Sequence, residues 1–467
     1  MNLTYLKHRA DEDWLIGYDT NQFHHLTEQL FQEFTQLSQG GTSPTILLAE
    51  PNPWRFLAAF LAAVAADCPV FLGNPNWVEQ EWQQVFELVQ PDLIWGDLSS
   101  VICHLSFVKN KGQRTTDNEQ IIMIPTGGSS GNIRFAVHSW QTLMASARGF
   151  YQYFDQKPVN SFCVLPLYHV SGLMQFLRSL TTGGKLVILP FKDLVTGKGQ
   201  DINPSEFFIS LVPTQLQRLL STVAAEWLSQ FQTVLLGGAP AWESLLADAR
   251  HHRIRLALTY GMTETASQVV TLKPEDFLAG NNSCGQILPH AQVSVRSATG
   301  ELLGTNQTGI ITIQADSLAL GYYRAGEYPN LNSKLQTLES DDLGFFDDRG
   351  YLTIIGRRSH KIITGGENVF PAEVEAAILA TQQVVDIAVI GLPDRYWGEA
   401  ITAIYVPPSP EVSVDLLQRA VAEKLSKFKC PKYWVKVECL PRNAQGKVNY
   451  EELKNIALAD LEMRKGA

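Results

Sequence analysis

The chain has 467 residues, of which 45% are hydrophobic, so it is long enough for more than one hydrophobic core and we expect at least two domains. Its 37 Lys and Arg against 47 Asp and Glu give a formal net charge of −10, which argues against nucleic acid as a partner. The six cysteines include no C-x-x-C pair, so the sequence predicts neither a zinc site nor a disulfide framework. The longest apolar run, residues 56–66, is too short to span a bilayer, and the N-terminus lacks a signal-peptide pattern; we therefore expect a cytoplasmic protein.

Short apolar runs alternate with longer helical patterns from about residue 45 onward. This alternation is typical of β-α-β units and predicts an α/β fold with large, doubly wound sheets flanked by helices. In such sheets, ligand-binding loops follow the carboxyl ends of the strands. The first segments are 45–49, 53–66, 69–73, 77–89 and 92–95, and later strand-like runs are 162–165, 185–190, 207–212 and 233–236.

The pattern changes after about residue 291 to short alternating strands with glycine turns, which predicts a smaller β subdomain. A basic stretch at residues 356–360 then precedes a unit of roughly 110 residues with helical and strand-like segments, which is enough for a domain. We therefore expect an N-terminal domain over residues 1–356 and a small, mobile C-terminal α/β domain over residues 357–467.

A loop of glycine and hydroxyl side chains follows the apolar run 121–124. Small residues let backbone N–H groups face one anion, the hydroxyls add donors, and Arg134 adds positive charge, so the loop suits a phosphate group. The chain has no Gly-Lys followed by Ser or Thr and no G-x-G-x-x-G, which excludes the Walker and Rossmann fingerprints. The alternative is a plain turn after a strand. The loop residues are Thr126, Gly127, Gly128, Ser129, Ser130 and Gly131.

Two further segments suit a nucleotide. Tyr260, Thr263 and Glu264 offer a ring for a purine, a hydroxyl for a phosphate oxygen and a carboxylate for a magnesium ion; the alternative is a helix N-terminus capped by the threonine. Upstream, an apolar run ends in a glycine turn where a flat base could approach the backbone, and a purely structural turn is the alternative. The residues of this turn are Gly237, Gly238, Ala239 and Pro240.

Each of three more segments has two interpretations, one as part of a nucleotide site and one as an ordinary surface or linker feature. Asp342 could accept hydrogen bonds from both ribose hydroxyls, or it belongs to an acidic surface turn. Arg357 could lie near a nucleotide and Ser359 could absorb a backbone rotation, or both belong to a basic linker. Lys447, in the loop 441–447, could reach a departing pyrophosphate, or it is an ordinary surface lysine.

Together these segments resemble the adenylate-forming, AMP-binding superfamily of acyl-CoA synthetases, and the likeness extends from about Thr45 to about Lys454. Residues 165–173, 210–214 and 260–268 are most similar to the 2-succinylbenzoate–CoA ligases (o-succinylbenzoyl-CoA synthetases) of cyanobacterial type. The resemblance implies an ATP-dependent acid–thiol ligase in phylloquinone or menaquinone biosynthesis. In that family the acid carboxylate attacks the α-phosphate to give an acyl-adenylate and pyrophosphate, and the thiol of CoA then displaces AMP.

The resemblance also implies roles for single residues. The catalytic residues would be Lys447, His169, Glu264 and Thr263, with Glu264 also holding magnesium. ATP would be bound by the residues of the phosphate loop and by Arg134, Gly237, Gly238, Ala239, Pro240, Tyr260, Asp342 and Arg357. The acid would contact Ser171, Arg178, Thr214, Ser267 and Gln268, and the arginine would meet a second carboxylate. CoA would pass Gly365, Gly366 and Glu367, and Ser359 would be the hinge of a domain rotation.

Two positions depart from the superfamily pattern, since Arg134 replaces the usual lysine and His360 replaces the usual acidic residue of the hinge. The expected partners are a small carboxylic acid, ATP with magnesium, and CoA; a homo-oligomer is left open. Three alternatives also stay open. They are a CoA ligase for another aromatic or fatty acid, an adenylation enzyme that delivers to a carrier protein, and a catalytically inactive nucleotide-binding homologue.

Overall fold

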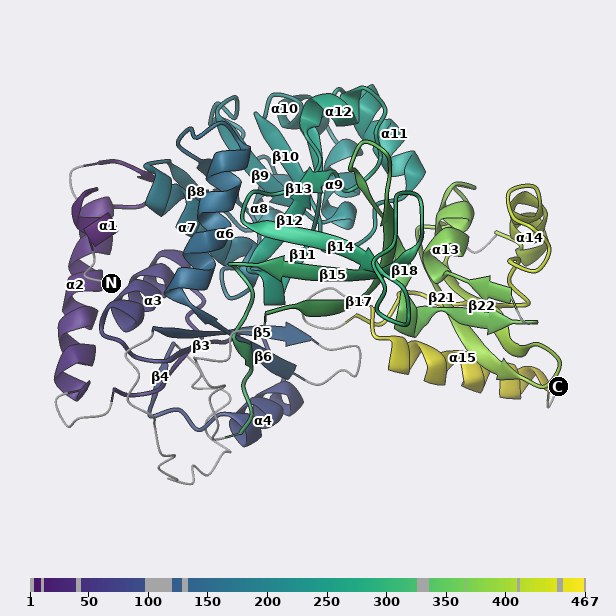
Figure 1. Cartoon of the computed structure of the whole chain (residues 1–467), viewed down its shortest axis with the longest axis horizontal. Helices are drawn as coiled ribbons and strands as arrows, with labels where there is room; N and C mark the ends of the chain where they lie inside the picture. Colours follow the sequence, from purple (N-terminus) through teal and green to yellow (C-terminus); the bar gives the residue numbers. More distant parts are fainter. Residues whose placement is uncertain are drawn as a thin grey trace.

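A computed structural model of the protein describes residues 4–9, 12–38, 43–96, 120–127, 133–325, 336–365, 367–409, 412–442 and 448–465. Their strands form four sheets, and the α/β fold class predicted from the sequence is confirmed. Figure 1 shows α13, α14, α15, β21 and β22 as a group beside the larger remainder of the chain.

The largest described sheet has eight strands in the order β1-β8-β7-β9-β10-β11-β12-β13. Pairing is parallel from β1 to β11, and the last two strands are antiparallel. The carboxyl ends of the parallel strands therefore share one edge, where the loops after β10 and β11 lie. The bounds are β1 (Leu15–Ile16), β7 (Asn160–Cys163), β8 (Leu186–Ile188), β9 (Phe207–Leu211), β10 (Thr233–Leu236), β11 (Leu256–Met262), β12 (Ser267–Thr271) and β13 (Gln286–Ile287).

A second described sheet has six strands in the order β16-β6-β5-β3-β2-β4. Strands β5 and β6 are an antiparallel pair, from Ile121 opposite Ser139 to Gly127 opposite Ile133. The expected phosphate loop thus connects two strands, and its residues 128–132 lie outside the described residues. The bounds are β2 (Ile46–Leu48), β3 (Val70–Leu72), β4 (Leu93–Trp95), β5 (Ile121–Gly127), β6 (Ile133–Ser139) and β16 (Gly321–Tyr322).

The other two sheets lie in the C-terminal half. The antiparallel sheet β14-β15-β17-β18 is the β subdomain expected from the sequence, and it consists of β14 (Ala291–Arg296), β15 (Gly309–Ala315), β17 (Leu338–Phe346) and β18 (Leu352–Arg357). The last sheet follows the order β20-β19-β22-β21, with β23 parallel to β22. Its strands are β19 (Ile362–Thr364), β20 (Glu367–Val369), β21 (Asp386–Asp394), β22 (Gly398–Val406) and β23 (Tyr433–Lys436).

Helices cover the sheets and supply much of the core. In helix α3 (Pro53–Ala65), residues 56–65 are all apolar and all buried, as expected for a helix packed inside a protein. No helix within the described ranges combines the length and apolar character needed to cross a membrane. The other helices are α1 (Thr4–Lys7), α2 (Thr20–Leu37), α4 (Glu79–Leu88), α6 (Trp140–Tyr153), α7 (Val170–Thr182), α8 (Phe191–Val195), α9 (Pro213–Leu220), α10 (Ala224–Leu228), α11 (Glu243–His251), α12 (Pro274–Leu278), α13 (Pro371–Leu379), α14 (Val414–Ala422) and α15 (Tyr450–Lys465).

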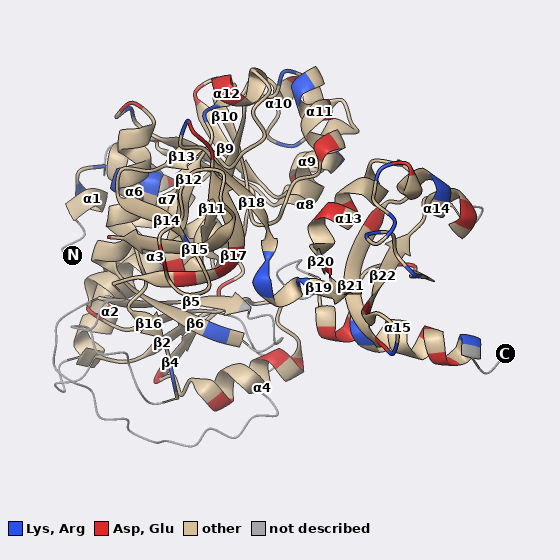
Figure 2. Ribbon diagram, turned by 45° about the vertical axis from the view of Figure 1, so that its right-hand side comes forward, with Lys and Arg blue, Asp and Glu red and all other residues tan. Residues whose placement is uncertain are grey.

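The chain passes from the β subdomain to the last sheet over a few residues. Strand β18 ends at Arg357, the 3₁₀ turn η3 (Arg358–His360) follows, and β19 begins at Ile362. Figure 2 shows basic residues where β18 leads toward β19. The domain boundary that we expect after residue 356 falls at this passage and stays a prediction.

Candidate active site

A tight turn, η2 (Thr263–Thr265), joins β11 to β12 and carries the predicted phosphate and metal residues. Ala266 and Ser267 have φ values of 51° and 94°, so the chain reverses through left-handed backbone. Gly261 is required beside this reversal, because a Cβ at that position would clash with the carbonyl oxygen of Ser267. The α-helix considered as an alternative is therefore replaced by a short, constrained connection between two strands.

Polar groups from distant segments fix the backbone of this turn. His138 Nε2 lies 2.8 Å from the carbonyl oxygen of Thr263, and Ser146 Oγ donates to the Ala266 carbonyl at 2.6 Å. Ser317 Oγ donates to the Thr265 carbonyl at 2.8 Å, and the Ala319 amide donates to the Glu264 carbonyl at 2.8 Å. The backbone carbonyl groups of four successive residues thus each have a hydrogen-bond partner. These bonds fix the backbone and so hold the Thr263 and Glu264 side chains in a defined orientation.

His138 is fully buried, and both of its ring nitrogens lie within hydrogen-bonding distance of a partner. Because the Thr263 carbonyl oxygen only accepts, Nε2 carries the proton, and Nδ1 lies 3.0 Å from Thr142 Oγ1. Burial lowers the pKa of His138 to about 4 from its ordinary value of 6.5.

We expect this histidine to make the fold sensitive to acid. Between pH 6.5 and 4 this histidine binds a proton in the unfolded chain but not in the folded protein. Its contribution to the free energy of unfolding is therefore fully present above pH 6.5 and decreases as the pH falls. The loss between pH 7 and pH 5 should be about 2 kcal/mol from this residue. Urea unfolding of the wild type and of His138→Gln at both pH values checks this. The variant should lose less stability than the wild type, and equal losses would contradict the assignment.

Glu264 is oriented by a residue that the sequence analysis missed. The Tyr322 hydroxyl donates to Glu264 Oε1 at 2.5 Å, and only 8% of the glutamate is exposed. On the other side, the Arg134 guanidinium lies over the Tyr322 ring, 4.7 Å from its centroid. The structure therefore brings together the predicted metal carboxylate and the predicted phosphate-binding arginine, with one tyrosine between them.

The donor set at this turn fits magnesium. The Glu264 carboxylate, with one oxygen bonded to Tyr322, can offer the other oxygen, and Thr263 lies next to it. In the described part of the chain, no cluster of three or more His, Cys, Asp or Glu side chains could hold a metal ion. Magnesium is commonly bound through one or two carboxylates together with the phosphates of a substrate, so a single buried carboxylate near the predicted phosphate-binding Arg134 suits it.

The glycine turn and the tyrosine of the next strand lie at the same sheet edge. Gly237 follows β10, and a Cβ there would clash with Thr259 Oγ1, so the turn approaches β11 closely. Gly238 has a φ of 81°, and residues 238–240 are exposed. The ring of Tyr260 is buried, and burial together with the charge of Asp342 raises its pKa. The residues assigned to the base thus lie beside one another, although the assignment itself stays a prediction.

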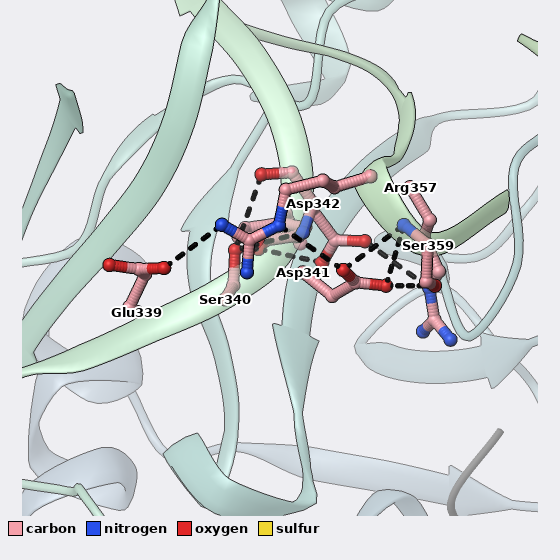
Figure 3. Close-up of polar contacts among 8 residues, drawn as sticks. Glu339, Ser340, Asp341, Asp342, Arg357 and Ser359 are labelled. Atoms are coloured by element: carbon pink, nitrogen blue, oxygen red, sulfur yellow. Dashed lines mark hydrogen bonds and ion pairs between the residues drawn. The ribbon is translucent and has the colours of Figure 1, made fainter. Parts of the chain in front are cut away.

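Strand β17 presents different groups on its two faces (Figure 3). On one face the Tyr260 hydroxyl donates to Asp342 Oδ2 at 2.9 Å and lies 3.3 Å from Ser340 Oγ. Arg357 Nε also approaches Asp342, at 3.3 Å from Oδ1. Because the Tyr260 hydroxyl contacts both Ser340 and Asp342, the two side chains share this face, which carries the residues predicted to bind ribose.

The opposite face of β17 contacts the predicted hinge. The Ser359 amide lies 3.2 Å from Asp341 Oδ1, and the Ser359 hydroxyl donates to the same carboxylate. Arg358 bonds Glu339 at 3.1 Å and lies 3.7 Å from Asp341. Next to them, His360 packs on Tyr450 of α15 with ring centroids 4.3 Å apart. The hinge segment is therefore fixed on both sides in this arrangement.

Arg178 is a buried cation without an acidic partner among the described residues. It is 3% exposed, donates to Gln268 Oε1 at 2.9 Å and to Ser267 Oγ at 3.1 Å, and stacks 4.1 Å from the centroid of Phe150. Its Nε and the Nε2 of Gln268 are buried donors without a partner. Burial lowers the pKa of Arg178 to about 9. A buried charge in this state favours an anionic ligand.

Further predicted residues in the described part of the chain lie at α7, α9 and the last sheet. His169 is the N-cap of α7, its ring 4.6 Å from that of Tyr168, and Ser171 lies in the first turn of the same helix. Thr214 is exposed in the first turn of α9. Gly365, with a φ of 58°, and Glu367 flank the β19–β20 turn of the last sheet. Predicted residues outside the described part of the chain are Gly128, Ser129, Ser130, Gly131, Gly366 and Lys447.

His138, Tyr322 and His290 are the principal residues that the sequence analysis missed. The ring nitrogens of His290 are buried without a partner, and burial and the nearby charge of Arg178 lower its pKa to about 4. None of the three lies in a motif of the chain. His138 lies 125 positions from Thr263, and Tyr322 lies 58 positions from Glu264, so only the fold shows the contacts.

Comparisons with known proteins identify the family and the fold. The AMP-binding enzyme family matches residues 22–323, and the AMP-binding enzyme C-terminal domain matches residues 373–447. The 2-succinylbenzoate–CoA ligase of Enterococcus faecalis is 32% identical over 72% of this chain and 70% of its own. The 2-succinylbenzoate–CoA ligase of Oceanobacillus iheyensis is 31% identical over 78% of this chain and 75% of its own. The o-succinylbenzoate CoA synthetase of Bacillus subtilis, solved with the acyl-adenylate intermediate OSB-AMP, superposes with a TM-score of 0.80 at 23% identity, over 96% of this chain and 97% of its own.

Proposed function

The chain belongs to the AMP-binding enzyme family and is an AMP-forming acyl-CoA ligase, and from this premise we propose that its acid is 2-succinylbenzoate. The proposal includes a role in menaquinone or phylloquinone biosynthesis, a cytoplasmic location, and the form of the enzyme found in cyanobacteria. Relatives that are named 2-succinylbenzoate–CoA ligases support the acid.

The observation that carries the substrate proposal is the buried Arg178. 2-Succinylbenzoate has two carboxylates, of which one is activated and the other must be recognised without reacting. The guanidinium is held by Gln268 and Ser267 yet keeps a free Nε, and Gln268 keeps a free Nε2. A second carboxylate that reached these buried donors would form charge-assisted hydrogen bonds, which are the strong ones. Acids with a single carboxylate would leave the cation buried and unpaired.

We propose that adenylation follows the chemistry of the family. A carboxylate oxygen of the acid forms a bond to the α-phosphorus of ATP, the bond to the bridging oxygen breaks, and pyrophosphate leaves. Thr263 would contact the α-phosphate, and Asp342 with Arg357 would hold the ribose. Magnesium held at Glu264 would neutralise phosphate charge. Lys447 would offset the charge that develops on the α-phosphate, an effect worth about 3 kcal/mol in a dry site.

In the second half-reaction we propose that the thiol of CoA loses its proton to solvent, its sulfur forms a bond to the acyl carbon, and AMP leaves with the electron pair of the broken C–O bond. We propose that His169 lines the route of the thiol and that Gly365, Gly366 and Glu367 line the pantetheine channel after a rotation about Ser359. The hinge contacts of Ser359 and Arg358 to β17 support a defined first orientation, which must be released for the second step.

Acid-dependent release of AMP tests the proposal. With ATP, magnesium and CoA present, 2-succinylbenzoate should be turned over, whereas benzoate, a coumarate and medium-chain fatty acids should not. Turnover of another acid instead would keep the chemistry and reject the substrate. AMP release that needs a carrier protein in place of CoA would favour the stand-alone adenylation enzyme, and ATP binding without pyrophosphate exchange for any acid would favour an inactive homologue.

A further inference from the structure

We propose that Tyr322 is a positioning residue of the nucleotide site, where it holds the Glu264 carboxylate and keeps it apart from the Arg134 guanidinium. This inference rests on the proposed magnesium role of Glu264. Tyr322 itself contacts neither an acid nor CoA in the proposed reaction, so its effect is exerted through its two neighbours.

The placement of Tyr322 follows from strand pairing. Strand β16 adds to the edge of β6, with Tyr322 opposite Ala136, and β6 also carries Arg134. Residues two apart on a strand share a face, so Arg134 and Tyr322 are diagonal neighbours across the pair. This register places the guanidinium over the aromatic ring, 4.7 Å from its centroid.

The same segment also fixes Glu264 at two points. Three residues before Tyr322, the Ala319 amide donates to the Glu264 carbonyl at 2.8 Å, and the Tyr322 hydroxyl donates to Oε1 of the side chain at 2.5 Å. One short stretch of chain therefore sets both the backbone and the carboxylate of this residue. With Oε1 engaged, Oε2 is the oxygen that remains for a cation.

The position of Tyr322 keeps the opposite charges of Arg134 and Glu264 from pairing with each other. An arginine and a glutamate on adjoining segments would form a direct ion pair, and each would then be less available to its own ligand. The structure has no ion pair between Arg134 and Glu264, because each contacts a different part of Tyr322. The ring face takes the cation and the hydroxyl takes the anion, so the phosphate-binding and metal-binding charges stay separate.

Calorimetric binding of ATP to the full chain, in EDTA and in excess magnesium chloride, tests this without reliance on turnover. Magnesium should lower the Kd of the wild type for ATP. In Tyr322→Phe the factor by which magnesium lowers this Kd should be about ten-fold smaller, because a hydrogen bond to a charged group is removed. Binding of ATP in EDTA should change by less than about two-fold, since the ring that seats Arg134 remains. Tyr322→Leu should weaken binding in both conditions, because Glu264 and Arg134 can then pair directly.

Two further variants separate the possible outcomes. Tyr351→Phe is the matched control, because its hydroxyl also donates to a carboxylate, Asp276 Oδ2 at 3.1 Å, but in α12; it should leave ATP binding unchanged. Glu264→Gln should abolish the gain from magnesium. Suppose that Glu264→Gln abolishes the gain from magnesium but Tyr322→Phe binds ATP like the wild type in both conditions. The positioning role of Tyr322 is then wrong, while the proposed metal role of Glu264 stands. If Glu264→Gln keeps the full gain, both fail. Equal weakening by Tyr322→Phe in EDTA and in magnesium would also overturn the inference.

Discussion

Replacing Arg178 by leucine is expected to raise the KM for 2-succinylbenzoate by about 100-fold or more, because a carboxylate would then be buried without its charged partner. The KM for 4-oxo-4-phenylbutanoate, which has the same skeleton without the ring carboxylate, should change by less than about three-fold. Both values come from pyrophosphate exchange measured over a range of acid concentrations. General damage to the pocket would raise the KM of both acids, whereas loss of the partner of the second carboxylate would raise only the KM for 2-succinylbenzoate.

Arg250→Leu is a suitable control for this experiment. Arg250 also stacks on a phenylalanine, Phe277, at 4.4 Å, and donates to an asparagine side chain, but it belongs to α11. It should leave both KM values unchanged. If Arg178→Leu raised the KM of the two acids equally, the arginine would serve the pocket as a whole and the substrate assignment would lose its main support.

Replacing Ser359 by proline is expected to slow thioester formation by roughly 100-fold while pyrophosphate exchange stays within a few-fold of the wild type. Proline fixes φ, so a hinge that must rotate between two half-reactions can adopt only one of its backbone states. Single-turnover reaction of preformed acyl-adenylate with CoA measures the second step, and pyrophosphate exchange measures the first.

Ser359→Ala distinguishes the rotation from the local hydrogen bonds. It removes the hydroxyl contact to Asp341 but keeps the amide that lies 3.2 Å from the same carboxylate. Since the alanine backbone remains free to rotate, thioester formation should proceed at close to the wild-type rate. Equal losses in both half-reactions for Ser359→Pro would reject the hinge, and a slow second step in Ser359→Ala would assign the effect to the hydroxyl instead.

The sequence predicted the fold class because burial follows a regular pattern in this chain. The apolar run 56–66 corresponds to α3, and the alternating runs correspond to strands of the two large sheets. The antiparallel pairing of β5 with β6 was not predicted, because strand direction depends on the path of the connection rather than on the composition of each strand. The family and its ligase chemistry are also confirmed, since motif residues cluster in short segments.

The site was less accessible to sequence reasoning. Arg178, Ser267 and Gln268 were predicted as a group, and the structure shows their direct contact; their role toward the acid stays a prediction. The partners that hold the site residues in place were not predicted. His138 and Tyr322 act on groups of the η2 turn from other strands, and nothing in their own neighbourhood distinguishes them from core or edge residues. Such contacts depend on the packing of distant elements.

The alternation along β17 has a consequence for the evolution of the gene. Ser340 and Asp342 contact Tyr260 on one face, while Glu339 and Asp341 contact the hinge segment on the other. Single substitutions alter one face at a time, so the two can vary independently. The pairing of β17 with β15 shifts register between Glu339 and Leu343, so these side chains occupy an irregular stretch of the strand whose length determines which group each one faces. Homologous genes should therefore tolerate changes of residue in this strand far better than changes of its length.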